Sequence, residues 1–358
     1  MKYRKTTIYE QTDASTAKTQ PIDLDLSEII SRLQIKFNST NNGHTPTDHP
    51  AKQISKVEIV DGSDVLFSLS AQQIEALMFY EYEKGRNYEM EYRNGVENRM
   101  VLDILFGRKL WDPELAFDPR KFKNPQLRVT HNLALGGSAP NAATLEVFAD
   151  VFDEKPVSPI GFLQMKELKN YATGASQANE YTDLPNDYPI RRILLQAYKA
   201  DLWWDNIFSE IELDEENKKR LPWSIDAYDL MQLAATKYGQ YEETLVGTTP
   251  GVAADQRWYV TPTEAPFVAL TGIGSSTLMS TDAEATGGYF RIQNTAVQAF
   301  RALIRGIIPH GVVPLDCGDL MDLSDWYDVS VKGKIKLRLK AGGSTTVYIL
   351  LQQLRKYA

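Results

Sequence analysis

Residues 57–85 read VEIVDGSDVLFSLSAQQIEALMFYEYEKG, and this stretch decides the fold. Val57 and Ile59 lie on one face of an alternating strand, Asp61-Gly62 is a hairpin turn signal, and a second alternating strand follows. Ser70-Ala71-Gln72-Gln73 then spells a capping box, in which the serine accepts from the third amide of a helix and the glutamine reaches back. The stretch therefore predicts a strand hairpin that leads into a helix ending at Gly85.

The same unit returns later in the chain. At a lag of 154 residues (211 − 57) the matches are Val57 with Ile211, Ile59 with Leu213, Ser70 with Ser224, Ile74 with Tyr228, Leu77 with Met231 and Gly85 with Gly239. A further echo pairs Ile193-Leu194-Leu195-Gln196 with Ile349-Leu350-Leu351-Gln352, at a lag of 156 (349 − 193). Solenoid repeats have periods of about 20–50 residues, whereas these lags have the size of a domain. We therefore expect two tandem copies of one fold, the second with a helix from Ser224 to Gly239.

The rest of the chain favours β-structure, because period-two apolar runs recur between Pro- and Gly-bearing connections. We predict an all-β fold of two tandem eight-stranded antiparallel jelly rolls (a double jelly roll), with a few short helices in connections. One of these helices is expected near Thr295–Arg305. The predicted division is an arm over 1–50, a first roll over 51–203 and a second over 204–358. The joint falls near Asp201–Asn206, where Trp203 and Trp204 predict a rigid seam.

Residues 1–50 differ from the rest in composition. They are rich in Thr, Ser, Asn, Asp and Pro, which is typical of a solvated arm. One short apolar-periodic piece, with Leu26, Ile29, Ile30 and Leu33, predicts a single helix. The arm starts with basic residues, which are Lys2, Arg4, Lys5 and Lys18.

Composition excludes several classes of protein. The chain of 358 residues is 43% apolar, which suits globular cores, and its net charge of −8 disfavours sequence-specific nucleic-acid binding. The single cysteine, Cys317, excludes an internal disulfide and is expected to be a small buried residue. No apolar run approaches the ~20 residues of a membrane span, and the N-terminus lacks the apolar segment of a secretory signal. We therefore expect a soluble protein without an export signal.

The histidines give no catalytic or metal motif. There are four, and His44 and His49 stand five apart in a predicted loop, which is weak ligand spacing. His131 lies on an apolar strand face and is expected to be a core residue, while His310 has no motif around it. We predict no catalytic residue, no cofactor-binding residue and no metal ligand.

Carboxylates and glycines leave two alternatives open. Asp316, Asp319, Asp322, Asp325 and Asp328 recur every three residues, which suits either calcium ligation or the capping of a loop. Glu210 and Glu212 share a strand face, as paired acids of a glycosidase do, but solvation explains them equally. The glycine-rich stretch 272–276 lacks the Lys-Ser or Lys-Thr ending of a phosphate-binding loop.

These residues resemble a known family, the double jelly-roll major capsid proteins. Such proteins build tailless icosahedral viruses, commonly with an internal membrane, including bacteriophages, and adenovirus hexon belongs to the wider lineage. The resemblance is carried by Lys56–Ser70 with the helix Ala71–Lys84, residues 145–150, Tyr188–Lys199, Ile308-Pro309-His310-Gly311, Leu315-Asp316, Lys334–Lys340 and Thr346–Gln352. It covers roughly 50–358 and rests on layout.

The resemblance implies a structural subunit of a virion capsid, made in the host cytoplasm. It implies a homotrimer of pseudo-hexagonal outline that forms an icosahedral shell, with minor capsid or penton proteins and internal membrane lipids as further partners. The family's terminal segments lie on the inner side of the shell. Basic residues that would then face anionic lipid or neighbouring subunits are Lys2, Arg4, Lys5, Arg355 and Lys356.

Two other readings stay open at this stage. Tandem jelly rolls also occur in secreted glycan-active enzymes, which carry acids at the domain seam. A carbohydrate-binding attachment protein would stack sugars on tryptophans, and the candidates are Trp203, Trp204, Trp223 and Trp258. Aromatic residues are, however, large contributors to cores and seams. The mass of the assembly separates these readings from the capsid reading.

Overall fold

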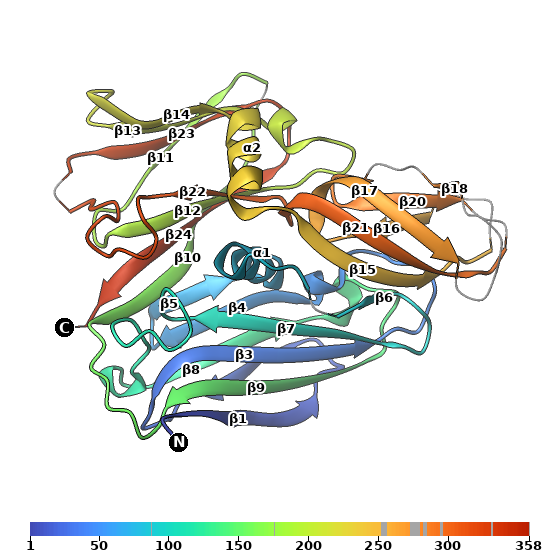
Figure 1. The fold of residues 1–358 in the computed structure, drawn as a ribbon, viewed down its shortest axis with the longest axis horizontal. Coiled ribbons are helices and arrows are strands. Elements are labelled where there is room, and N and C mark those ends of the chain that lie inside the picture. The colour runs from blue at the N-terminus through green and yellow to red at the C-terminus, as the bar shows by residue number, and fades with distance from the viewer. Residues whose placement is uncertain are drawn as a thin grey trace.

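The two strand–hairpin–helix units of the repeat are present, one in each of two β-sandwiches (Figure 1). The computed structural model describes residues 1–86, 88–174, 176–251, 256–272, 280–281, 285–293, 296–330 and 332–357. The glycine-rich stretch 272–276 lies outside these residues apart from Gly272. Among the described residues, no helix has the length and apolarity needed to cross a membrane.

The first sandwich, here called the first roll, packs two antiparallel four-stranded layers against one core. One layer has the order β1 (Tyr3–Asp13), β9 (Ala142–Phe152), β3 (Ile29–Thr40), β7 (Glu97–Leu105). The other has the order β2 (Lys18–Asp23), β8 (Pro125–His131), β4 (Ile54–Asp61), β5 (Asp64–Leu69). Apolar side chains that alternate along both layers, such as Leu33, Ile35, Val57 and Ile59, form one buried cluster.

The second sandwich, here called the second roll, repeats this layout. One layer has the order β10 (Gly161–Ala172), β24 (Thr346–Lys356), β12 (Ile190–Ala197), β22 (Val312–Asp316). The other has the order β11 (Asn179–Asp183), β23 (Ile335–Ala341), β13 (Phe208–Glu215), β14 (Arg220–Asp226). When its strands are numbered in chain order, the order in each layer equals that of the first roll. The predicted double jelly roll is therefore confirmed.

The two rolls are joined edge to edge. β5 of the first roll pairs in parallel with β10 of the second, at Phe67 with Met165 and Ser68 with Lys166. One layer of each roll thus belongs to a continuous eight-stranded sheet. Helix α1 (Ala71–Tyr82) follows β5, and helix α2 (Ala227–Tyr238) follows β14. Short 3-10 turns are η1 (Pro50–Gln53), η2 (Pro119–Lys121), η3 (Leu133–Leu135) and η4 (Trp204–Asn206).

An insertion interrupts the second roll between α2 and β22. Its larger sheet has the order β19 (Ala285–Thr286), β17 (Pro262–Gly272), β21 (Ala299–Pro309), β15 (Tyr241–Thr248), β6 (Met90–Glu91). Its smaller sheet has the order β16 (Gln256–Tyr259), β20 (Tyr289–Gln293), β18 (Ser280–Thr281). The insertion has its own apolar cluster around Trp258 and Phe300. It extends from one side of the molecule (Figure 1).

The expected N-terminal arm is wrong, because residues 3–40 form β1, β2 and β3 of the first roll. The helix predicted around Leu26–Leu33 is instead the start of β3, where Leu33 and Ile35 face the core. Strand pairing with β7 and β9 overrides the local helical spacing. The predicted cut at 203/204 also fails to separate the rolls, since β10 and β12 precede it and pair with β24.

Four details of the predicted helices and repeats need correction. Residues 299–305 lie in β21 rather than in a third helix, and Thr295 is outside the described residues. α1 ends at Tyr82, and Gly85 instead allows close approach to Glu242, whose carbonyl would lie 2.3 Å from an added Cβ. α2 is capped by Asp226 because β14 continues through Ser224. The echo of 193–196 in 349–352 lies in two adjacent strands of one roll, so it is not a match between rolls.

Candidate functional site

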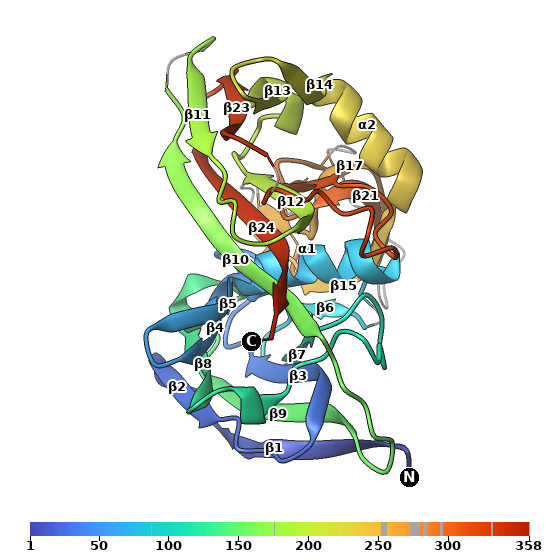
Figure 2. The ribbon, with the colours of Figure 1, turned by 90° about the vertical axis from the view of Figure 1, so that its left-hand side faces the viewer.

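Helix α1 lies where the first roll, the second roll and the insertion meet (Figure 2). The predicted capping box is confirmed: Ser70 accepts from the amide of Gln73, and the Gln73 side chain accepts from the amide of Ser70. No residue of α1 is exposed. Two buried polar clusters attach this helix to its surroundings, and they are the candidate site of this chain.

The first cluster joins α1 to the second roll. Both carboxylate oxygens of Glu81 accept from the guanidinium of Arg191, and Arg192 approaches the same carboxylate at 3.3 Å. Arg192 also donates to Asp316 at 2.6 Å through Nε, and to the hydroxyl of Tyr238 at 3.0 Å. Both arginines are almost fully buried. We call these residues the seam cluster.

The acidic and basic groups of the seam cluster keep each other ionised. Burial alone would raise the pKa of Glu81, but the charges of Arg191 and Arg192 hold it below its ordinary value. Burial would likewise raise the pKa of Asp316, and Arg192 lowers it. A buried carboxylate and guanidinium remain charged only in each other's company, because each alone would be strongly destabilised by the loss of water.

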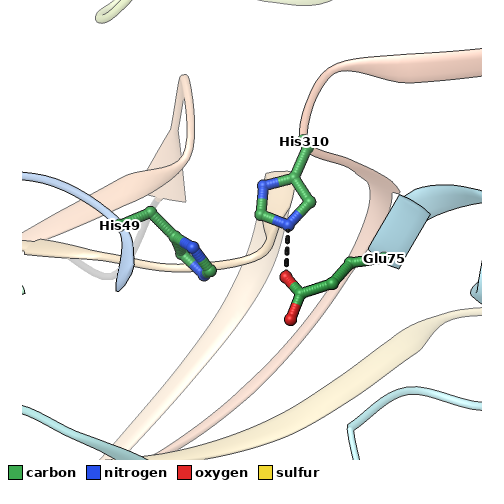
Figure 3. Close-up of side chains that lie close together, drawn as sticks. All are labelled: His49, Glu75 and His310. Atoms are coloured by element: carbon green, nitrogen blue, oxygen red, sulfur yellow. Dashed lines mark hydrogen bonds and ion pairs between the residues drawn. The ribbon is translucent and has the colours of Figure 1, made fainter. Parts of the chain in front are cut away.

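The second cluster joins α1 to the insertion and to the loop before β4 (Figure 3). His310 Nε2 lies 2.8 Å from Glu75 Oε2, and Arg86 forms an ion pair with the same carboxylate. His49 packs edge to face on His310, with ring centroids 4.6 Å apart. Its Nε2 lies 3.2 Å from the hydroxyl of Thr261. The side chains of all these residues, including Arg86, are buried.

The residues His49, Glu75 and His310 were not predicted as a group, and we tested whether they fit a metal ion. Two histidines and a glutamate are ligands that Zn²⁺ takes, but ligands at about 2.1 Å lie about 3.4 Å apart in a tetrahedron. Here the ligand atoms are only within 4.8 Å of one another. His49 Nδ1 accepts from the amide of Ala51, which places the proton on Nε2, and Arg86 already neutralises Glu75. The cluster therefore fits a hydrogen-bonded junction better than a metal centre.

His49→Asn is expected to make the protein less sensitive to mild acid. Burial, followed by the charges of His310, Arg86 and Lys52, holds the pKa of His49 well below its ordinary value. Below about pH 6.5 the unfolded chain takes up a proton that the folded chain does not, so the free energy of unfolding falls as the pH falls. The measurement is urea unfolding from pH 8 to pH 5, in which the wild type should lose up to about 1.4 kcal/mol more per pH unit than the variant.

His44→Asn is the matched control for this experiment, because His44 is only half-buried and lies in the preceding loop. It should leave the acid dependence of the wild type in place. Equal slopes for the wild type and His49→Asn would show that His49 is not the responsible group.

The predicted basic site residues lie at two strand ends on the side away from the insertion (Figures 1 and 2). Lys2 and Lys356 are exposed and make no ion pair with any described residue. The other three form ion pairs within the chain: Arg4 pairs with Glu28, Lys5 with Asp150 at 3.0 Å, and Arg355 with Asp64. The structure thus places both termini on the side away from the insertion, and two of the five predicted residues there, Lys2 and Lys356, have no ion pair with a described residue.

The aspartates between 316 and 328 do not converge on one point, and each accepts hydrogen bonds from its own partners. Asp316 belongs to the seam cluster, whereas Asp322 and Asp328 each accept from an amide two residues ahead, at 2.9 and 3.0 Å. Asp325 accepts from the amide of Asp319 at 2.7 Å. The loop-capping alternative therefore accounts for these carboxylates. Glu210 and Glu212 likewise pair with Arg338 across β13 and β23.

Core expectations for individual residues hold. Cys317 is buried, and burial raises the pKa of its thiol to about 12, so it is a poor nucleophile. His131 is buried on β8 beside the ring of Phe37, as expected of a core residue, but neither of its ring nitrogens has a hydrogen-bond partner among the described residues, so the expectation of a satisfied histidine is wrong. Of the tryptophans considered for sugar stacking, Trp204 and Trp258 are fully buried, and Trp203 is 39% exposed.

No protein-family model matches this sequence, and no curated protein matches it. Solved structures do match over nearly the full length. The STIV MCP, from the Sulfolobus Turreted Icosahedral Virus, aligns with a TM-score of 0.61 at 12% identity, covering 99% of this chain and 97% of that one. The major capsid protein P2 from bacteriophage PM2 gives 0.58 at 8% identity, covering 99% and 98%.

The PBCV-1 virus capsid protein gives a TM-score of 0.56 at 10% identity, covering 98% of this chain and 93% of that one. Identities this low speak for the fold and not for shared chemistry. Together with the identical strand order of the two rolls, they lead to one conclusion: this chain has the double jelly-roll fold of viral major capsid proteins.

Proposed function

We propose that this chain is a major capsid protein, a structural subunit whose three copies form a capsomer of pseudo-hexagonal outline and tile an icosahedral shell. The observation that carries the proposal is the pair of rolls with one strand order, joined through the pairing of β5 with β10. Three chains of two similar bodies supply six similar walls, and closed rotational symmetry is the usual arrangement of homo-oligomers. A structural role needs no catalytic residue.

The rolls suit assembly because a covered strand edge resists indiscriminate strand pairing, and β5 and β10 cover each other's edges. We further propose that the insertion points outward and that the end bearing both termini faces the interior, towards an internal membrane or minor capsid proteins. Among the predicted basic residues, Lys2 and Lys356 are exposed and free of ion pairs with described residues, so they are available for anionic lipid there. Electron cryo-microscopy of particles with both termini on the outer surface would contradict this orientation.

The purified chain is expected to be a trimer of about 121 kDa, three times its mass of 40.4 kDa. Light scattering coupled to size-exclusion chromatography measures this mass, and negative-stain images should show a hexagonal outline. A monomer of 40.4 kDa that retains or cleaves glycans would instead favour the carbohydrate-binding or glycan-active reading.

A further inference from the structure

We propose that helix α2 is the surface by which the second roll of one chain binds the first roll of the next copy, on the outer face of sheet β1-β9-β3-β7. This inference rests on the proposed assembly and names the contact that holds it together. It comes from comparing α2 with its counterpart α1, which is already covered inside the chain.

The two helices are equivalent. Each has 12 residues, begins with alanine and ends with tyrosine, and follows the same edge strand of its roll. The terminal tyrosines make the same contact, since Tyr82 donates to Asp103 at 3.0 Å and Tyr238 donates to Asp316. Asp103 and Asp316 lie on equivalent strands, β7 and β22. Residues of α1 and α2 therefore correspond at a difference of 156 (238 − 82), so the helix matches predicted at a lag of 154, such as Leu77 with Met231, are two residues out of register.

α1 uses one set of positions to contact the second roll. The side-chain Nε2 of Gln73 donates to the side-chain oxygen of Gln196 at 2.7 Å, and the Tyr80 hydroxyl donates to the carbonyl of Val312 at 2.6 Å. Glu81 forms the ion pairs of the seam cluster. The helix thereby lies on the outer face of sheet β10-β24-β12-β22.

The same positions of α2 are open to solvent. They are Asp229, Thr236 and Lys237, which correspond to Gln73, Tyr80 and Glu81. Leu233, which corresponds to the buried Leu77, is 56% exposed, and Tyr228 is 52% exposed. A groove of about 670 Å³ beside the helix is lined partly by Trp203, Tyr228 and Met231. Side chains of this size are normally covered at an interface.

A receiving surface exists on the first roll. Sheet β1-β9-β3-β7 has the strand order of the sheet that covers α1. Its outer face is hollowed by about 420 Å³ between β3, β7 and α1, with Gln34, Met78, Val101 and Asp103 among the lining residues. Gln34 on β3 is the counterpart of Arg192 on β12. In the strand register, Gln34 lies opposite Asp103 and Arg192 lies opposite Asp316, which is the residue equivalent to Asp103.

The charged groups of the two surfaces contribute less than the apolar ones. Within the chain, the carboxylate of Glu81 meets two arginines. Lys237, which takes the place of Glu81 on α2, pairs with Asp316 of its own chain at 2.7 Å and stays half exposed. On the receiving sheet, Arg32 already binds Asp103 and Asp150 at 2.7 Å each, and Lys5 binds Asp150 at 3.0 Å. The apolar surface of Leu233 and Tyr228 therefore carries the proposed contact.

The contact joins two different surfaces, so it is heterologous and propagates from copy to copy until it closes. Contacts of a helix with the next sheet would then alternate, within a chain through α1 and between chains through α2. A ring of six rolls built in this way closes after three chains. A second copy of this chain is thus the occupant that the duplicated helix indicates.

Leu233→Glu tests the proposal, with Val297→Glu as the matched control, because Val297 is 68% exposed on the insertion. Light scattering over a concentration series should show that the wild type and Val297→Glu are trimers. Leu233→Glu should raise the dissociation constant at least about tenfold, because a carboxylate would be buried against apolar side chains. Circular dichroism establishes that each variant is folded.

A disulfide tests the geometry independently. The double variant Gln34→Cys/Lys237→Cys should form covalent trimers on mild oxidation, whereas either single variant should not, since the native Cys317 is buried. A Leu233→Glu trimer of unchanged affinity without cross-links would overturn the α2 contact and leave the capsid proposal standing. A wild type that stays monomeric at every concentration would overturn both.

Discussion

Replacing Glu81 with alanine is expected to lower the free energy of unfolding by about 3–5 kcal/mol. The reason is that Arg191 and Arg192 are almost completely buried, and without the Glu81 carboxylate only Asp316 remains to balance two guanidinium charges. Removal of one partner of a buried ion pair leaves an uncompensated charge away from water. Chemical unfolding at a protein concentration where the chain is monomeric measures the change.

Glu97→Ala is the control, because Glu97 pairs with Arg99 on the surface. Surface pairs contribute about 0–1 kcal/mol, so this variant should unfold like the wild type. A loss below about 1 kcal/mol for Glu81→Ala would mean that the seam cluster does not hold α1 to the second roll.

Trp204→Ala is expected to cost about 3–5 kcal/mol of unfolding free energy, as large-to-small changes of buried aromatic residues do. Trp204 is 0% exposed, its ring packs on Phe208, and its indole Nε1 donates to the carbonyl of Gly311 at 3.0 Å. Truncation removes apolar burial and also leaves this carbonyl without its donor. The same unfolding measurement applies.

Trp203→Ala provides the contrast, because Trp203 is 39% exposed and precedes Trp204 directly. Under monomeric conditions it should cost less than about 1 kcal/mol. Equal losses for the two variants would show that both rings are structural and that the exposed ring is not reserved for an interface.

The duplicated fold was predictable because its signals are local. A strand hairpin followed by a 12-residue helix recurs in each roll, and in the first roll a hairpin turn and a capping box mark it, so each signal depends on residues only a few positions apart. The layout of the C-terminal strands was also predictable, since Ile335, Leu337 and Leu339 alternate cleanly and point into the core.

The N-terminal strands were missed for a physical reason. β1 lies at a sheet edge and β2 has mostly exposed residues, so their composition resembles that of a solvated arm. β3 carries Ile29 and Ile30 before its alternating part, and such a doublet also fits a helix. Strand pairing with partners about 110 residues away decided the outcome, as Lys36 with Glu146 illustrates.

The clusters around α1 could not be read from the sequence. Glu75 and His310 are 235 positions apart, and Glu81 and Arg191 are 110 apart, so no spacing motif links them. Only the docking of α1 between the two rolls brings these groups together. The one available signal was the presence of Glu75 and Glu81 within a mostly apolar helix.

The insertion borrows a strand from the first roll. β6 comes from residues 90–91 and pairs in parallel with β15 at Leu245 and Val246, while the hydroxyl of Tyr92 donates to the carbonyl of Tyr259 at 2.9 Å. The insertion is therefore encoded by two separated pieces of the chain. Grafting it onto another double jelly-roll scaffold, to display a foreign epitope, means transplanting the short piece around 90–92 along with 241–309, or else the transplanted sheet ends in a bare edge.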